Sequence, residues 1–430
     1  TLTGGAQLTF GGTVNSSSSG DPLTSDTNNL STIFTETAFE KRVGGSNGLG
    51  DIDITGSLSL DSAIEEASSL SVLTTSEIHA DITTSGNQEF TDNVTLNQNV
   101  TFTTTSNGNV TFGGNINGAK ILTITTNGTG DVSVTGSIGN STGLTGLTVS
   151  TDDFDAVAIK VGGDISITNT DTSSSTISGV ISDNGATAAT FTKAGAGVLT
   201  LTGNNTYTGL TTINAGTLTL NDADGGTGTV IADSTAITVN GGILDLDDST
   251  ETVGTLTLTS GSITGTGNTI TGSSYVINPS SGTVTISANL GGTGIDLTKS
   301  GNGIYLSSGS HTYTGTTTLT AGTLLVGSDT VGTITSSAIG IGTFIVNGGT
   351  ISSDSGSART LKNAVSFTGN GTFGDGTNTG KLTFTGATEL GNSADRTITV
   401  ADSTTTEFSG IIGDGAGDYG IVKAGAGTLI

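Results

Sequence analysis

The strongest constraint on the fold is a pair of apolar residues that recurs every 19 residues. The first members of the pairs are Leu199, Leu218, Ile237, Leu256 and Tyr275, and the second members are Leu201, Leu220, Val239, Leu258 and Ile277. Residues i and i+2 of a strand point to one face, so each pair predicts two inward side chains. The constant step predicts a β-solenoid with about 19 residues per coil in this region.

A longer repeat contains several of these coils. The stretch Lys193–Leu220 aligns without a gap with Lys299–Val326, with 14 of 28 positions identical, and a third copy begins at Lys423. Self-similarity of this kind is typical of solenoids rather than of separate globular domains. We therefore expect one continuous repeat protein.

The composition indicates an all-β chain. Of the 430 residues 70 are Gly and 2 are Pro, and Leu, Ile and Val alternate with Thr over short stretches. Gly and Asn adopt positive φ easily, which places Asn214, Asn240 and Asn347 at corresponding corners of the coil. Asp61–Leu73 is the one stretch compatible with a short helix, and strands are the alternative.

The charge excludes some partners. The net charge is −26, from 37 acidic and 11 basic residues, so binding to nucleic acid or to anionic lipid is not expected. The chain has no Cys for disulfides and no run of 18 apolar residues that would span a membrane.

The repeat Lys193–Leu220, with its K-x-G-x-G opening, N-T-Y-T-G centre and A-G-T-L close, resembles the passenger-associated repeat of autotransporter proteins. The stretch Gly86–Ala119 resembles repeats of large secreted bacterial adhesins, including those of the two-partner secretion type. The resemblance implies a right-handed parallel β-helix displayed on the bacterial surface. It divides the rod into an N-terminal β-rich region at 1–85 (with the possible helix), adhesin-like coils at 86–190 and autotransporter-type coils at 191–430.

Two motifs match enzyme patterns by composition. Gly44–Gly48 fits the G-x-S-x-G nucleophile elbow, with His79 and His311 as the available bases, but lacks a strand-to-helix context. Gly369–Gly374 fits G-x-G-x-x-G but opens no helix, so a corner turn is the better interpretation. Polysaccharide cleavage, known for other parallel β-helices, is disfavoured by the absence of Trp and by only 5 Tyr. We predict no catalytic site and no enzyme activity.

We also predict no cofactor and no dedicated metal site. Gly291–Asp296 matches the start of a calcium-binding nonapeptide, but no adjacent copy completes the oxygen cage. The acidic corners Asn221–Gly226 and Leu244–Asp248 offer carboxylates for weak Ca²⁺ binding at most, and a solvated corner is the default.

Two residue types recur at fixed repeat positions. Tyr207 and Tyr313 are expected to pack in the core rather than to stack on a ligand. Lys193, Lys299 and Lys423 are expected to stretch their stems over the Gly-rich coil edge, without a chemical role.

Two functions remain open. The first is a non-enzymatic adhesin shaft on the bacterial surface, whose contacts with a host or neighbouring-cell glycan or protein lie outside this chain. The second is a structural subunit of an extracellular filament, sheath or surface layer. The segment Thr1–Gly5 resembles the residues that come directly after the internal copy of Lys423–Ile430. We therefore expect either a piece of a longer chain or subunits joined head to tail.

Overall fold

The computed structural model describes residues 2–3, 7–12, 29–44, 49–170, 175–222, 229–330, 332–391, 394–415 and 417–430. These residues form parallel strands without any helix, and the predicted all-β solenoid is confirmed. The solenoid has about 17 turns of about 22 residues. The chain divides into two compact units, residues 1–211 with 215–219 and residues 212–214 with 220–430.

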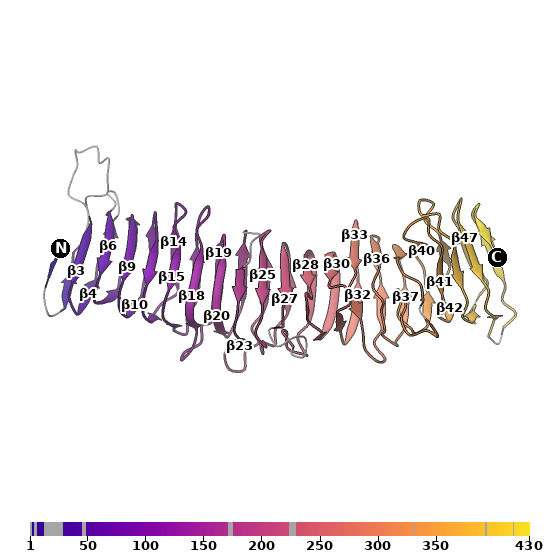
Figure 1. Cartoon of the computed structure of the whole chain (residues 1–430), viewed down its shortest axis with the longest axis horizontal. Helices are drawn as coiled ribbons and strands as arrows, with labels where there is room; N and C mark the ends of the chain where they lie inside the picture. Colours follow the sequence, from indigo (N-terminus) through magenta and orange to yellow (C-terminus); the bar gives the residue numbers. More distant parts are fainter. Residues whose placement is uncertain are drawn as a thin grey trace. The chain divides into compact units, whose positions relative to one another are not determined.

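In the N-terminal unit each coil contributes a strand to each of three parallel ladders (Figure 1). The first ladder contains β1 (Leu2–Thr3), β3 (Leu30–Ile33), β6 (Asp51–Ile54), β9 (Ser69–Val72), β12 (Gln88–Phe90), β15 (Val110–Phe112), β18 (Val132–Ile138), β20 (Phe154–Val161), β22 (Ser175–Ile177) and β25 (Val198–Leu201). The second contains β2 (Leu8–Phe10), β4 (Glu36–Phe39), β7 (Ser57–Leu60), β10 (Ser76–Ile78), β13 (Val94–Leu96), β16 (Ile116–Asn117), the distal halves of β18 and β20, and β23 (Ile181–Asp183). The third contains β5 (Val43–Gly44), β8 (Ile64–Ala67), β11 (Ile82–Thr84), β14 (Val100–Thr104), β17 (Ile121–Thr125), β19 (Gly146–Thr151), β21 (Ile165–Asn169) and β24 (Phe191–Ala194).

The C-terminal unit repeats this plan. Its first ladder contains β28 (Ile237–Asp245), β30 (Thr255–Thr264), β33 (Thr283–Ile286), β36 (Ile304–Ser307), β38 (Thr323–Val326), β40 (Thr350–Ser353), β43 (Gly371–Phe373), β46 (Arg396–Val400) and β49 (Ile421–Ala424). Its second contains the first halves of β28 and β30, then β32 (Ser274–Ile277), β35 (Leu297–Lys299), β37 (Thr317–Leu319), β39 (Phe344–Val346), β42 (Val365–Phe367), β45 (Thr388–Glu389) and β48 (Ile412–Gly413). Two short sheets complete the coils: β29 (Glu251–Thr252), β31 (Thr269–Thr271) and β34 (Asn289–Leu290), and β41 (Arg359–Leu361), β44 (Leu382–Phe384), β47 (Thr405–Phe408) and β50 (Thr428–Leu429). Strands β26 (Thr211–Ile213) and β27 (Thr217–Leu220) lie at the division between the units.

Of the two alternatives for Asp61–Leu73, a short helix and strands, the structure shows strands. This stretch forms β8 and β9, with Ile64, Ala67, Leu70 and Val72 buried. Ser68 lies between the two strands, and parallel partners on the neighbouring coils take up the backbone hydrogen bonds of both. Tertiary pairing thus overrides the helical preference of Glu and Ala.

All ten residues of the predicted apolar pairs point inward, since none is more than 1% exposed. The 19-residue step is confirmed where Leu256 pairs with both Ile237 and Tyr275. Outside such tight coils the step is longer, as in the 22-residue pairing of Phe90 with Phe112. Extra residues are accommodated in the corners, so the inward register is kept.

One step of the predicted series is wrong. The amide of Asn240 donates to Asn214 Oδ1 (3.3 Å) and that of Asn221 donates to Asp247 Oδ2 (2.7 Å), so this coil takes 26 residues. Because Asn240 stacks on Asn214, Ile237, which precedes Asn240, stacks on a residue that precedes Asn214. Leu218 follows Asn214. Leu218 and Ile237 therefore lie on different ladders, although they are 19 residues apart in the sequence.

Candidate functional site

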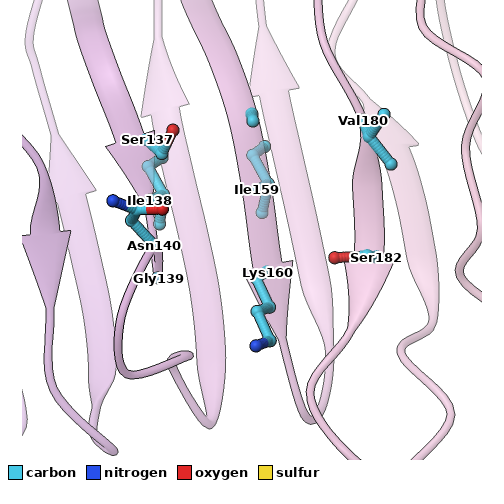
Figure 2. Close-up of a pocket in the computed structure, with 9 residues that line it drawn as sticks. Ser137, Ile138, Gly139, Asn140, Ile159, Lys160, Val180 and Ser182 are labelled. Carbon is cyan, nitrogen blue, oxygen red and sulfur yellow. The ribbon is translucent and has the colours of Figure 1, made fainter.

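The outer face of the N-terminal unit is hollowed where strands β18 and β20 bend. A first hollow of 190 Å³ lies over three consecutive coils (Figure 2). Two rows of residues from adjacent coils border it, Ser137–Ala158–Val180 and Gly139–Lys160–Ser182, and Asn140 closes one end.

A second hollow of 370 Å³ lies on the other side of the bend, over the same three coils. Its rows are Ser133–Asp155–Thr176 and Thr135–Val157–Ser178. We call the two hollows together the β18–β20 groove.

The sequence produces the groove through an irregular pairing and a glycine. The register between β18 and β20 shifts between Val134 and Ser137, which bends both strands away from a flat face. Gly139 has φ +80°, and a Cβ there would lie 2.3 Å from the carbonyl oxygen of Lys160. The first hollow therefore depends on the missing side chain at Gly139.

The groove carries one charge of each sign. None of the described residues forms a hydrogen bond or ion pair with the ammonium of Lys160. Asp155 Oδ1 accepts the backbone N–H of Thr176 (2.9 Å), while partial loss of water raises the pKa of Asp155 and the nearby Asp153 carboxylate adds to this rise. Val157 and Val180, 42% and 41% exposed, add apolar surface to the borders of the two hollows.

The prediction that the recurrent lysines lie over the coil edge is wrong for two of the three copies. Lys193 and Lys299 are fully buried and turn inward. The ammonium of Lys299 donates to the carbonyl oxygens of Ser300 (2.7 Å), Gly301 (2.9 Å) and Ala321 (3.0 Å). Lys193 makes the same three contacts with Ala194 (2.8 Å), Gly195 (3.0 Å) and Ala215 (3.4 Å). Lys423 is exposed and contacts two carbonyls.

Burial of these ammonium groups has an electrostatic cost. Loss of water lowers the pKa of Lys193 and of Lys299 to about 8. The carbonyl dipoles replace part of the lost hydration, and no carboxylate of the described residues pairs with either lysine. Each lysine ammonium and its three carbonyl oxygens form a cluster that we call the lysine cluster. In this cluster the carbonyl oxygens surround the ammonium as they would surround a bound cation.

The predicted packing role of the recurrent tyrosines is confirmed. Tyr207 and Tyr313 are both fully buried. Their hydroxyls bond to the threonine four residues on, Thr211 (2.7 Å) and Thr317 (2.5 Å). Neither ring is available to a ligand.

His311 also belongs to the core. Its Nδ1 accepts the N–H of Leu290 (3.0 Å), so the ring proton lies on Nε2, which donates to Ser307 Oγ (2.8 Å). Ser307 in turn donates to the carbonyl oxygen of Ala338 (2.6 Å). Burial lowers the pKa of His311 to about 3, so the neutral ring serves as a connector between coils.

A buried carboxylate that sequence reasoning missed lies in β29, three residues after the acidic corner Leu244–Asp248. Glu251 is fully buried and accepts the N–H groups of Val230 (3.0 Å) and Ile231 (3.1 Å). Burial raises the pKa of Glu251 to about 7. Among the described residues no group of three His, Cys, Asp or Glu side chains is placed to hold a metal ion. Ala223–Gly226 of the first acidic corner lies outside the described residues.

The other motifs fall into corners and strands. Gly45–Gly48 of the G-x-S-x-G match lies outside the described residues. Gly369–Gly374 contains β43 and ends at Gly374 with φ +79°. In Gly291–Asp296 the carboxylate of Asp296 accepts hydrogen bonds from the backbone N–H and the hydroxyl of Thr316, so this carboxylate already has partners within the fold.

The sequence contained one signal for the groove that the 19-residue search missed. Asparagines at 22-residue intervals bond along the corners of the N-terminal unit: Asn87 accepts from Asn109, and Asn93 from Asn115. A search at this period would have brought Ser137, the continuation of the second series, into register with its neighbours. The 22-residue period predicts neither the bend of strands β18 and β20 nor the charged residues of the groove.

These features define a β-solenoid repeat protein with a polar groove on its N-terminal unit and internal lysine clusters. A family description, the passenger-associated-transport-repeat, matches residues 191–220 and 297–326. The chain therefore carries these repeats, and the autotransporter resemblance predicted from the sequence is confirmed.

The chain is also similar to the adhesin BmaC autotransporter of Brucella suis biovar 1 (strain 1330). The two are 32% identical over 280 residues, which make up 63% of this chain and 7% of that protein. The chain thus spans a small part of its relative's length. No solved structure matches this chain. Within the described residues no helix is long and apolar enough to cross a membrane.

Proposed function

We propose that this chain is a non-enzymatic part of a bacterial cell-surface adhesin, in which the solenoid forms a shaft outside the cell and itself contributes to adhesion. The observation that carries the proposal is the pair of passenger-associated-transport-repeats in a chain similar to an autotransporter adhesin. Parallel coils suit this role because each coil adds length with the same local contacts.

Support for a non-catalytic role comes from the buried polar residues. His311 is bonded through both ring nitrogens inside the core, and Ser307 is equally buried. A general base must reach the proton that it abstracts from a substrate, and His311 has no such access.

Surface display tests the proposal. The chain is fused to an autotransporter translocator and displayed on a non-adherent laboratory bacterium, which is then counted on epithelial cells and on matrix-coated glass. We expect adherence several times that of cells displaying the translocator alone. Equal adherence on every surface would contradict the adhesive function, and depolymerisation of neutral or acidic polysaccharides by the purified chain would contradict its non-enzymatic character.

The alternative is a self-assembling subunit of an extracellular filament, sheath or surface layer. Negative-stain electron microscopy of the purified chain separates the two functions. An adhesin shaft gives single particles at micromolar concentration, whereas a subunit gives ordered polymers.

A further inference from the structure

We propose that the β18–β20 groove binds an acidic oligosaccharide, with a carboxylated sugar beside Lys160 and a neutral sugar beside Asp155. This inference rests on the proposed adhesive function and names the chemical class of its partner. It also differs from the sequence-based prediction, which placed the contacts outside this chain.

The first hollow has the chemistry of a carboxylate site. The Lys160 ammonium has no partner among the described residues, although the chain carries a net charge of −26. A charged group left unpaired in so acidic a chain attracts a small anion locally, and an amide and hydroxyls complete its hydrogen bonds. Asn140 and Ser182 supply these groups on the two sides of Lys160 (Figure 2).

The second hollow has the chemistry of a neutral sugar site. The Asp155 carboxylate accepts hydrogen bonds from the hydroxyls of a sugar and repels a second carboxylate. Ser133, Thr135, Thr176 and Ser178 provide hydroxyls that can both donate and accept. The order of charges along the groove therefore fixes the direction of the ligand.

Each hollow also has an exposed apolar side chain at its border. Val180 borders the first hollow and Val157 the second, and a sugar ring presents its C–H face to such side chains. The two hollows lie over the same coils, so one linear ligand reaches both. Without an aromatic platform the contact area per sugar is small, and we expect dissociation constants near the millimolar range.

Saturation-transfer NMR and calorimetry on the purified 430-residue chain test the inference. The probes are 3′-sialyllactose and aldotriouronic acid (glucuronosyl-xylobiose), each of which joins one carboxylated sugar, sialic or uronic acid, to neutral sugars, with lactose as the neutral control. We expect binding of at least one acidic probe and at least tenfold weaker binding of lactose. Lys160→Met should weaken the acidic probe at least tenfold, whereas Lys120→Met, which removes a lysine outside the groove, should not.

Asp155→Asn gives a second test. It should weaken 3′-sialyllactose, whose neutral sugars reach Asp155, and leave binding of free sialic acid unchanged, because a single acidic sugar occupies only the first hollow. Equal binding of lactose and the acidic probes, or no effect of Lys160→Met in a folded variant, would overturn the inference. Display assays separate this failure from that of the proposed function: adherence that persists in Lys160→Met keeps the adhesin and removes the glycan site.

Discussion

The ammonium of Lys299 lies 3.0 Å from the carbonyl oxygen of Ala321, a residue 22 positions further along the chain. Two other carbonyls on its own coil complete the cluster. Lys299 thus ties one coil to the next at a corner that is rich in glycine. The same contacts around Lys193 explain why the repeat begins with K-x-G-x-G and closes with A-G-T.

Removal of the lysine charge should weaken the fold. Lys299→Met keeps most of the stem volume but leaves three buried carbonyl groups without a donor, which should lower the free energy of unfolding by about 1–3 kcal/mol. Urea denaturation measures the change. Lys120→Met is the control and should change stability by less than about 0.5 kcal/mol. An unchanged urea midpoint for Lys299→Met would contradict a stabilising role of the cluster.

The same lysines predict a rise of stability in alkaline solution. The folded pKa is about 8 and the ordinary value is 10.5, so between these values the unfolded state binds more protons. The free energy of unfolding should therefore rise from pH 8 towards pH 10, by up to about 3 kcal/mol per lysine. Burial raises the pKa of Tyr275 to about 12, so ionisation of this tyrosine in the unfolded state reverses the trend above about pH 10. The Lys193→Met, Lys299→Met double variant should lose the rise.

Gly322 gives a steric test of the cluster. Its φ is +66°, and a Cβ would lie 2.6 Å from the Lys299 ammonium and 2.4 Å from two carbonyl oxygens. Gly282 has nearly the same φ, +68°, with nothing near the added Cβ. Gly282→Ala should cost about 1 kcal/mol from the backbone conformation alone, and Gly322→Ala at least about 3 kcal/mol. Similar losses of thermal stability in the two variants would show that the lysine cluster tolerates displacement.

Much of the fold could be predicted because inward and outward residues alternate with period two. Leu256, Leu258 and Ile277 were placed correctly on this basis alone, since a strand offers only two faces. The step from Leu218 to Ile237 was placed incorrectly. Sequence spacing alone cannot show whether seven extra residues enlarge a corner or move the following residues to another ladder. Only the pairing of Asn240 with Asn214 decides that question.

The functional residues were harder to predict. An inward lysine contradicts the usual preference of Lys for the surface, and its acceptors are backbone carbonyls, which leave no trace in the sequence. The groove depends on a register shift between two strands that each look regular. Recurrence of Lys193 and Lys299 at one repeat position was visible, but its physical reason was not.

The inward register predicts that the same substitution at two adjacent residues lowers stability by very different amounts. Leu258 is fully buried between Val239 and Ile277, whereas Thr257 on the same strand faces outward. Leu258→Asp buries an unpaired charge and should cost several kcal/mol, enough to expose the coil to proteolysis. Thr257→Asp should cost less than about 1 kcal/mol. Limited proteolysis and circular dichroism compare the two, and equal sensitivity would contradict the assigned register.

His311 predicts a loss of stability in acid. Its pKa is about 3 in the fold and 6.5 ordinarily, so between these values the unfolded state binds the additional proton and stability falls as the pH is lowered, by roughly 5 kcal/mol in total. Glu251 acts in the opposite direction, because its folded pKa of about 7 lies above the ordinary 4.5 and the folded state binds the additional proton between these values.

The contribution of His311 must therefore be read as a difference between variants. His311→Gln can still accept the Leu290 N–H and donate to Ser307 without titrating, so wild type minus variant should show stability decreasing from pH 6.5 to pH 3. His79→Gln, at a partly exposed histidine, is the control. A flat difference curve for His311→Gln would mean that the ring is not held neutral in the core.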